Sequence, residues 1–222
     1  MNDLTLIIPA KYEKESLPKV LDELKKFDVK KNIVLEKSDK LTVEAISNYD
    51  CKIIYQDSVG YGDALKKGIQ TTETEFFCIF NADGSFNPDE LNIMISKIEK
   101  DKYDFVFATR YEKNCGSDDD TIVTYVGNYI FTLLGKIFFK LGITDILYTF
   151  VMGRTSFAKK LELTAKDFSF CVELPIKAKR ANYKICTSKS YERSRIAGKK
   201  KVNAFKDGLK ILLSMIKLFF RY

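Results

Sequence analysis

The stretch FFCIFNADGSFNPDEL, residues 76–91, contains a short apolar run, a polar loop and the start of a longer amphipathic segment. Five consecutive apolar residues at 76–80 favour a strand that is buried on both faces, as in a parallel sheet. Asp83, Gly84 and Ser85 follow this strand, and Pro88 suits the first turn of a helix. The stretch therefore predicts a strand–loop–helix unit with a carboxylate just beyond the strand, in a sequence, Asp-Gly, that is also common in simple turns.

The same alternation of apolar strands and amphipathic helices recurs through the first half of the chain. This order predicts an α/β fold with a mostly parallel sheet flanked by helices. Ligands of such sheets bind beyond the carboxyl ends of the strands, so the loops after residues 8, 35, 56, 80 and 109 are the candidates for a site. The predicted strands are 4–8, 33–35, 52–55, 76–80 and 105–108, and the predicted helices are 17–27, 61–70 and 88–100.

The second half of the chain contains two long apolar segments. Segment 122–141 is interrupted by Lys136 and Lys140 and falls short of the roughly 18 uncharged residues of a membrane span. It predicts either a buried helical hairpin or an interfacial helix pair. Segment 203–222 predicts an amphipathic basic helix that lies in a lipid headgroup layer, or else a terminal helix packed on the domain. Its apolar stripe is Phe205, Leu209, Leu212, Ile216 and Phe219, and its basic residues are Lys206, Lys210, Lys217 and Arg221.

The composition excludes several kinds of catalytic and metal site. The 222 residues suffice for one domain and contain no histidine, which excludes histidine as a base, a nucleophile partner or a metal ligand. Five scattered cysteines without a CxxC pair indicate reduced thiols in a cytosolic protein. The first residues lead directly into a predicted strand without a basic region or cleavage site, so we expect no secretory signal.

The net charge of +7 is unevenly distributed. Residues 176–222 contain 14 Lys and Arg against two acids and so supply +12, which leaves −5 for the first 175 residues. A basic end of this kind attracts anionic lipid, a phosphorylated ligand or nucleic acid. Its aromatic residues Phe219 and Phe220 are not interleaved with the basic ones as a base-stacking surface requires, so we expect no nucleic-acid partner.

Four motifs occur in an order that resembles a known family. They are IIPAKYEKESL at 7–17, GYGDALKKG at 60–68, NADGSFNPDEL at 81–91 and ATRY at 108–111. The chain resembles family-two inverting glycosyltransferases with a GT-A (Rossmann-like) fold, and is most similar to the dolichyl-phosphate mannosyltransferase and polyprenyl-phosphate glycosyltransferase branch. Asp145, Gly153-Arg154, Glu173 and RIAGKKK at 195–201 continue the likeness, which spans about residues 4–202.

The resemblance implies that different parts of the chain bind different substrates. It implies a nucleotide-sugar-binding half at 1–115, an acceptor-side half at 116–202 and the basic helix at 203–222. A catalytic role is implied for Asp83, Asp145 and Arg110, and Mg²⁺ or Mn²⁺ would be held by Asp83 with Asn81 and Ser85. The acceptor phosphate would be bound by Arg110, Arg193, Arg195 and the lysines Lys199, Lys200 and Lys201. The donor would be bound by Pro9, Ala10, Glu13, Glu36, Gly60, Gly62, Ala64, Gly68, Asn81 and Asp83.

Two departures from the family pattern weaken parts of this assignment. LEKSDKLTV at 35–43 replaces the family's nucleotide-base segment VDDGSTDGT, so Glu36 stands for its first Asp and Lys37 for its second. Asn81 replaces the first carboxylate of the metal motif. An amide oxygen still binds Mg²⁺ or Mn²⁺ but supplies less charge, so we expect weaker metal affinity.

The resemblance implies transfer of a sugar from a UDP- or GDP-linked donor to a polyprenyl phosphate, with inversion, at the inner face of the membrane. An acceptor phosphate is already an anion and needs no base. The first alternative is a lipid-linked or polysaccharide hydroxyl acceptor, for which Asp145 would be the base instead of orienting an arginine or the acceptor loop. The second alternative is a degenerate protein that binds a nucleotide sugar without catalysis. Glu173 is expected to be the buried partner of an arginine.

Overall fold

The computed structural model describes residues 3–198 and 200–220. Within these residues seven strands form one sheet in the order β3-β2-β1-β4-β7-β5-β8, and two short strands, β6 and β9, pair beside it. The strands of the main sheet are β1 (Leu4–Pro9), β2 (Lys30–Leu35), β3 (Lys52–Tyr55), β4 (Phe76–Ile79), β5 (Phe105–Thr109), β7 (Val151–Arg154) and β8 (Ile185–Lys189), with β6 at Gly116–Ser117 and β9 at Tyr191–Glu192.

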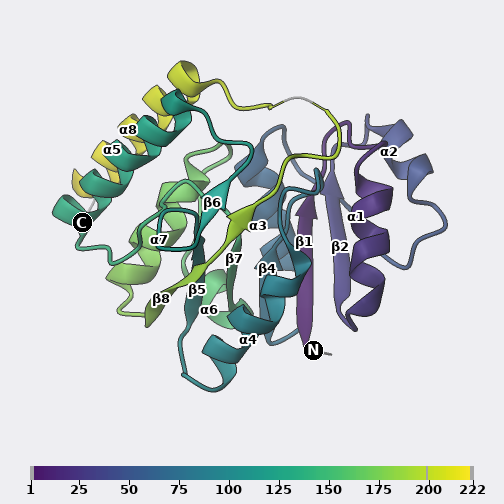
Figure 1. The fold of residues 1–222 in the computed structure, drawn as a ribbon, viewed down its shortest axis with the longest axis horizontal. Coiled ribbons are helices and arrows are strands. Elements are labelled where there is room, and N and C mark those ends of the chain that lie inside the picture. The colour runs from purple at the N-terminus through teal and green to yellow at the C-terminus, as the bar shows by residue number, and fades with distance from the viewer. Residues whose placement is uncertain (1–2, 199, 221–222) are drawn as a thin grey trace.

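Helices connect the strands and cover both faces of the sheet (Figure 1). Two 3₁₀ turns, η1 (Leu24–Lys26) and η2 (Pro88–Glu90), lie next to α1 and α4. The helices are α1 (Leu17–Glu23), α2 (Lys40–Ala45), α3 (Tyr61–Thr71), α4 (Leu91–Glu99), α5 (Ile122–Phe139), α6 (Thr155–Lys160), α7 (Phe170–Arg180) and α8 (Ala204–Phe220).

The alternation of side chains along β1 shows why two helical layers form. Leu6 and Ile8 belong to the core shared with α1 and α4, whereas Ile7 belongs to the core shared with α3, α6 and α7. Successive side chains of a strand point to opposite faces, so a strand that is apolar throughout needs a cover on both. A buried apolar strand between two helical layers follows directly.

The predicted fold class is confirmed: an α/β fold with a mostly parallel sheet. β1 pairs in parallel with β2 and β4, while β7 runs antiparallel between β4 and β5. All five predicted strands exist, and β2 begins three residues before the apolar run because Lys30, Lys31 and Asn32 already pair with β1. The short helix α2 was not predicted.

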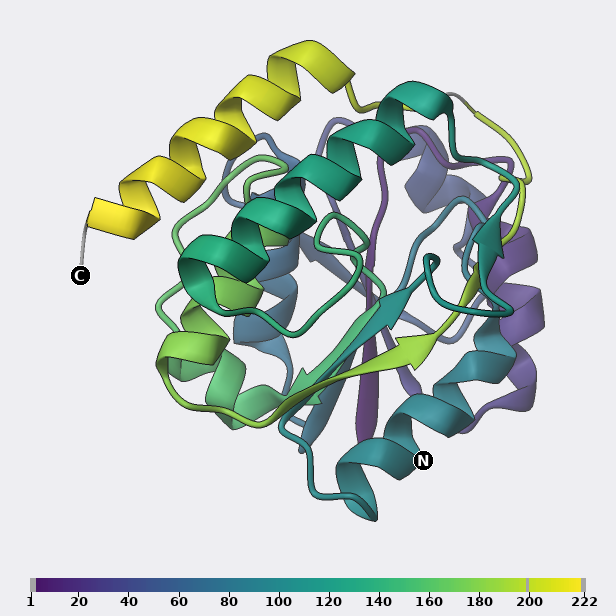
Figure 2. The same cartoon turned by 60° about the vertical axis from the view of Figure 1, so that its left-hand side comes forward.

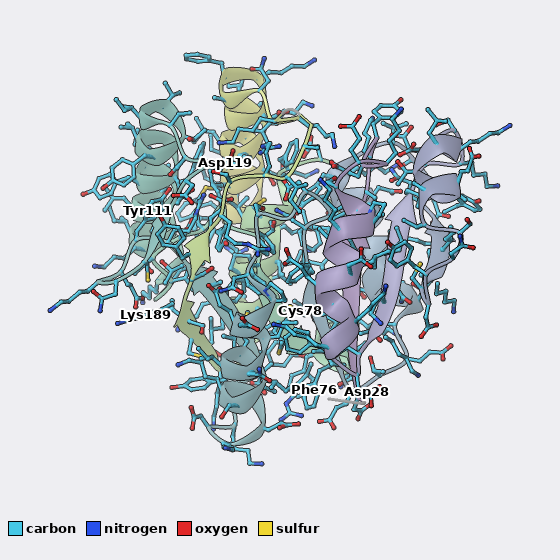
Figure 3. The ribbon with its side chains drawn as sticks, turned by 45° about the vertical axis from the view of Figure 1, so that its right-hand side comes forward. Asp28, Phe76, Cys78, Tyr111, Asp119 and Lys189 are labelled. Atoms are coloured by element: carbon cyan, nitrogen blue, oxygen red, sulfur yellow. The ribbon has the colours of Figure 1, made fainter. Side chains whose placement is uncertain are left out.

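The carboxyl ends of the parallel strands lie together at the top of Figure 1. Figure 3 shows Asp119 at this upper end of the molecule, whereas Asp28 and Phe76, which lie where β2 and β4 begin, are at the lower end. A connection formed by residues 193–198 and 200–203 links β9 to α8 across the carboxyl edge, since the Ile196 amide bonds to the Asp83 carbonyl and Lys201 pairs with Glu13. We call it the basic connection.

Segment 122–141 differs from the buried hairpin that was one of its two predicted forms. It is a single 18-residue helix, α5, that begins with a capping box between Thr121 and Thr124 and ends at Lys140 in a left-handed conformation, φ 54°. Only 17% of the helix is buried, although its mean hydropathy is 1.4. α5 lies beside α8 (Figure 2). The helix predicted for segment 203–222 is confirmed over 204–220, and residues 221 and 222 lie outside the described part of the chain.

Candidate active site

A cavity of about 600 Å³ opens at the carboxyl edge of the sheet. The loops after β1, β2, β3, β4 and β5 all contribute to its wall, as predicted for a site in a parallel sheet. The predicted site residues that line it are Pro9, Ala10, Glu13, Glu36, Gly60, Ala64, Asn81, Asp83, Arg110, Arg195, Lys200 and Lys201. A second cavity of about 550 Å³ lies between α7, α8 and residues 164–167, and no predicted donor or acceptor residue lines it.

Asp83 is held in place by the turn that follows β4. Its Oδ1 accepts hydrogen bonds from the Ser85 amide at 3.0 Å and the Ser85 hydroxyl at 2.7 Å. Its Oδ2 lies 3.7 Å from Arg195 Nη1. Ser85 is buried and bonded to the carboxylate, so it positions Asp83 and does not line the cavity as a predicted metal ligand would.

Asn81 and Asp83 fit a divalent cation that takes most of its ligands from a bound diphosphate and water. Asn81 donates its Nδ2 to the Ser85 hydroxyl at 3.3 Å, so its amide oxygen is not used in this bond, and both Asn81 and Asp83 line the cavity. Mg²⁺ in phosphate sites is commonly held by one or two carboxylates plus substrate oxygens. No group of three or more Asp, Glu, Cys or His that could hold a metal occurs among residues 3–198 and 200–220, so the cation would depend on the bound diphosphate.

The basic connection brings cations over these acidic groups. Arg195 makes a bidentate contact with Asp119, Nε to Oδ1 at 3.2 Å and Nη2 to Oδ2 at 2.7 Å, and Lys200 lies 3.2 Å from the same carboxylate. Burial would raise the pKa of Asp119, but these two cations outweigh it and lower that pKa. Lys201 pairs with Glu13, whose other oxygen accepts from Ser16. In the cavity, the cations Arg195, Lys200 and Lys201 are therefore paired with carboxylates of the protein, and an anionic ligand would compete with these carboxylates for them.

Arg110 is at the centre of a buried ion network. Asp145, which is 1% exposed, accepts from Arg110 Nε at 2.8 Å, from Nη2 at 3.0 Å and from its backbone amide at 3.1 Å, while Nη1 bonds Glu192 at 2.8 Å. Burial lowers the pKa of the guanidinium, but the carboxylates of Asp145 and Glu192 outweigh it and raise the pKa. Arg110 also lies over the Tyr148 ring, 4.5 Å from its centroid. The positive charge of Arg110 is thus compensated by the carboxylates of Asp145 and Glu192.

The loop at 60–62 contains two glycines because the backbone of residues 165–167 packs closely against it. A Cβ on Gly60 would lie 2.0 Å from the Lys166 carbonyl oxygen, and one on Gly62 would lie 2.7 Å from the carbonyl oxygens of Ala165 and Asp167. Of the two, only Gly60 lines the cavity. Gly68 packs against Ile7 of β1, where a Cβ would meet Cγ2 at 2.2 Å, so its role is helix–sheet packing.

The nucleotide-base end of the predicted site is formed by Lys11 and Glu36. Lys11 Nζ lies 2.8 Å from Glu36 Oε1, and hydrogen bonding to that carboxylate raises the pKa of Lys11. Tyr12 has a positive φ of 55°, its side chain is 67% exposed and its amide donates to Asp39 at 2.6 Å. Gln56 lines the same region and donates to the Gly60 carbonyl oxygen at 3.4 Å.

Several predicted residues lie away from the cavity. Arg193 donates to Glu23 at 2.9 Å and to the Phe86 carbonyl oxygen at 2.7 Å, and does not line the cavity as an acceptor-binding residue should. Glu173 is buried as expected, but its partners are Lys177 at 2.9 Å and the amides of residues 164 and 165, not an arginine. Lys199 lies outside the described residues.

Sequence reasoning missed some of the cavity wall. Asp119 belongs to the acidic run 118–120, and Glu192 and Tyr148 have no local motif, so only their tertiary partners reveal them. Cys171 also lines the cavity, and burial raises the pKa of its thiol to about 12, which keeps it protonated and unreactive. Tyr61 and Phe168 stack at 5.0 Å along the same wall.

The chain is similar in sequence to known proteins over much of its length. The family model described as "Glycosyl transferase family 2" matches residues 5–162. An "uncharacterized glycosyltransferase" of Mycobacterium tuberculosis is 25% identical over 97 residues, and the match covers 44% of this chain and 44% of that protein. The chain therefore spans less than half the length of the curated relative that it matches.

Solved structures share the fold over nearly the whole chain. Glucosyl-3-phosphoglycerate synthase from Mycobacterium tuberculosis, with Mn²⁺, UDP and glucosyl-3-phosphoglycerate, superposes with a TM-score of 0.78 at 13% identity, covering 98% of this chain and 80% of that one. The same synthase with Mg²⁺ and UDP gives a TM-score of 0.77 at 13% identity, covering 98% and 79%. At this identity the likeness establishes the GT-A fold alone.

Proposed function

Because the chain belongs to glycosyl transferase family 2, we propose that it moves one sugar from a nucleoside diphosphate sugar to a polyprenyl phosphate with inversion. The single observation that carries this proposal is the set of charges in the cavity. Asp83 faces the cavity beside Arg195, and Lys200 and Lys201 lie on the same wall. A carboxylate for a cation next to several cations for phosphate suits two phosphorylated substrates in one cavity.

The donor end is proposed at Glu36, Gly60 and Asp83. The similar synthase structures contain UDP together with Mn²⁺ or Mg²⁺, which supports a UDP-linked donor and a divalent cation here, with GDP the competitor to be tested. Asp83 Oδ2 and the Asn81 amide oxygen would hold the cation. When bound, the cation neutralises the diphosphate, which must leave as an anion.

The acceptor end is proposed at Arg195, Lys200 and Lys201. The acceptor's phosphate oxygen forms a bond to the anomeric carbon of the sugar, and the bond from that carbon to the diphosphate oxygen breaks, with its electron pair leaving on the nucleoside diphosphate. No proton has to be removed from a phosphate that is already ionised. This agrees with Asp145, whose two oxygens both accept hydrogen bonds from Arg110 and which does not line the cavity.

These contacts also favour a positioning role for Arg110. Its guanidinium already contacts Asp145 and Glu192, so the acceptor phosphate is proposed to be bound by the basic connection, and Arg110 to fix the wall on which Tyr148 and Glu192 lie. A hydroxyl acceptor would instead require a free carboxylate near the anomeric carbon. The family branch proposed is therefore the polyprenyl-phosphate one, acting at the inner face of the membrane.

The test is a panel of UDP- and GDP-linked sugars with Mg²⁺ or Mn²⁺, offered with a short polyprenyl phosphate or with 3-phosphoglycerate. We expect a new glycolipid with one donor, lost on Asp83→Ala and retained on Asp89→Asn, a carboxylate outside the cavity whose ion pair with Lys26 is exposed. A phosphoglycerate product alone would overturn the acceptor assignment. Donor binding without any product would favour the non-catalytic alternative.

A further inference from the structure

Helices α5 and α8 form one exposed apolar surface that the cavity does not use. They lie side by side in Figures 1 and 2, and Phe138 and Phe139 of α5 contact Phe219 of α8 at ring distances of 5.6 and 6.2 Å, so the two helices run in the same direction. The exposed side chains of this α5–α8 face are Ile122, Val123, Tyr125, Val126, Tyr129, Ile130, Leu133, Ile137 and Phe138 of α5, and Phe205, Leu209, Leu212, Leu213, Ile216, Phe219 and Phe220 of α8. A soluble domain rarely leaves such a contiguous apolar surface open.

The arrangement of residues around α8 is that of a helix lying at a lipid surface. At about 100° per residue, its exposed apolar side chains fall within an arc of about 120°. Lys206, Lys210 and Lys217 lie along one edge of this arc, and the buried Asp207, Ile211 and Leu218 lie on the opposite side, against the domain. The helix thus has one side on the protein, one apolar side in the open and a basic border.

The middle of α5 is attached to the domain by polar groups on its inner side. Asn128, which is 1% exposed, accepts a hydrogen bond from the Leu147 amide at 3.0 Å, and Thr132 accepts from the Ile146 amide at 3.2 Å. A helix that crossed a bilayer would have to break these bonds and expose the segment at 146–147 to hydrocarbon, where its amides would be unsatisfied. Although α5 is long and apolar enough to span, its contacts favour an orientation in the membrane plane.

The same two helices begin at the cavity. Asp119 lines the cavity three residues before α5, and Val202 lines it two residues before α8. Since an extended residue spans at most about 3.6 Å, the first turns of both helices start within about 11 Å of the cavity wall. A surface that contacts the α5–α8 face would therefore be adjacent to the cavity at the end where both helices begin.

We propose that the α5–α8 face is a docking surface for an anionic lipid bilayer, in which both helices lie parallel to the membrane and hold the cavity next to the headgroups. For its consequence on catalysis this inference rests on the proposed function: the acceptor's phosphate enters the cavity while its hydrocarbon chain stays in the bilayer. The charge favours lipid over a second copy of the chain, because the exposed lysines Lys136, Lys140, Lys206, Lys210 and Lys217 lie on or beside the face, while the one acid within the two helices, Asp207, is buried. Two copies would bring like charges together.

The first test is flotation of the full chain with vesicles containing phosphatidylserine, compared with neutral vesicles. We expect binding to anionic vesicles, weakened at least about tenfold by Ile130→Glu with Ile137→Glu on α5, and by Leu213→Glu with Ile216→Glu on α8. Leu41→Glu with Ile93→Glu adds the same charge at equally exposed apolar positions on α2 and α4 and should leave binding unchanged. Equal loss in all three variants, or a stable dimer that does not bind vesicles and separates on substitution of the face, would overturn the proposal.

A second test shows whether α5 lies in the plane of the membrane or crosses the bilayer. The chain contains no tryptophan, so Ile122→Trp, Ile130→Trp and Ile137→Trp each give a single fluorophore along α5. Quenching by lipids brominated at different depths should give the same shallow position for all three, about 5–10 Å below the headgroups. A deep position for residue 130 with shallow positions at both ends would show that α5 crosses the bilayer.

Failure of docking and failure of the proposed activity give different results. If the docking inference is wrong but the activity is right, the face variants will glycosylate a vesicle-embedded long-chain acceptor as well as the wild type does. If the activity is wrong, vesicle binding will persist with no product from any acceptor. When both hold, the face variants lose activity on the embedded acceptor and keep it on a short, water-soluble polyprenyl phosphate.

Discussion

Replacing Asp145 by Asn tests whether this residue organises Arg110 or acts as a base. Asp145 is 1% exposed and its two oxygens accept three hydrogen bonds from Arg110. Removing one partner of a buried pair typically costs about 3–5 kcal/mol because a charge is left uncompensated. Glu192 remains bonded to the guanidinium at 2.8 Å, so we expect a loss at the low end of this range, about 3 kcal/mol.

For a chain of 222 residues this loss corresponds to a decrease in Tm of about 6–12 °C, at about 2–4 °C per kcal/mol. Urea unfolding gives the free energy and a thermal scan gives the Tm. The control is Asp89→Asn, which breaks an exposed pair with Lys26 and should cost at most about 1 kcal/mol. Activity measured against pH completes the test, since a positioning residue lowers kcat without removing an ionisation from the profile.

A positioning role for Asp145 would be wrong if the variant has a free energy of unfolding within about 1 kcal/mol of the wild type yet has lost all activity. That result would assign Asp145 to proton transfer and would favour a hydroxyl acceptor. Loss of stability with partial activity at an unchanged pH profile would support the positioning role.

Other perturbations give equally definite expectations. Gly68→Ala places a Cβ 2.2 Å from Ile7 Cγ2 and should destabilise by about 1–3 kcal/mol, whereas Gly208→Ala in α8, with no heavy atom within 4 Å, should be neutral or stabilise by up to about 1 kcal/mol in urea unfolding. Burial would raise the pKa of Glu173, but hydrogen bonds from the Ala165 and Thr164 amides and from Lys177 outweigh it and lower that pKa. The ionised Glu173 therefore contributes its full stabilisation above about pH 5, and this contribution is lost as the pH falls through and below about 4. The free energies of unfolding of the wild type and of Glu173→Gln should then converge as the pH is lowered from about 6 to about 3. A difference that stays constant with pH would contradict this. Asn81→Asp should tighten Mn²⁺ binding in the presence of UDP on the order of tenfold, and unchanged binding by calorimetry would remove Asn81 from the metal site.

The sequence predicted five of the seven strands of the main sheet because each of these five contains a short apolar run followed by a polar loop. The runs at 76–80 and 105–108 became β4 and β5, and all five predicted loops line the cavity. The antiparallel strand β7 was not predicted, since VMGR offers no signal for its direction and its place between β4 and β5 depends on pairing with residues far away in sequence. Helix α5 was mistaken in part for a buried hairpin because hydropathy alone does not say whether an apolar face meets protein or the outside.

The candidate site was predictable where it follows strand ends and unpredictable where it depends on tertiary ion pairs. Asp83 and Glu36 follow strands and line the cavity. Arg193 looked equivalent to Arg195 in sequence, yet β9 and its flanking residues point Arg193 to Glu23 and Arg195 to Asp119. Gly62 matches a donor motif, but the tight approach of residues 165–167 explains why glycine is needed there.

Transfer of a sugar from a nucleoside diphosphate to a lipid phosphate, as we propose for this cavity, can be detected as a labelled lipid product. The full chain is incubated with radiolabelled UDP-sugars and GDP-sugars, Mn²⁺ and a polyprenyl phosphate in anionic vesicles, and the organic phase is analysed for a labelled lipid. We expect a labelled sugar–phosphate–lipid whose formation requires both the metal and Asp83. Label that appears only in a water-soluble phosphorylated product, under the same conditions with 3-phosphoglycerate, would rule out a lipid phosphate as the acceptor.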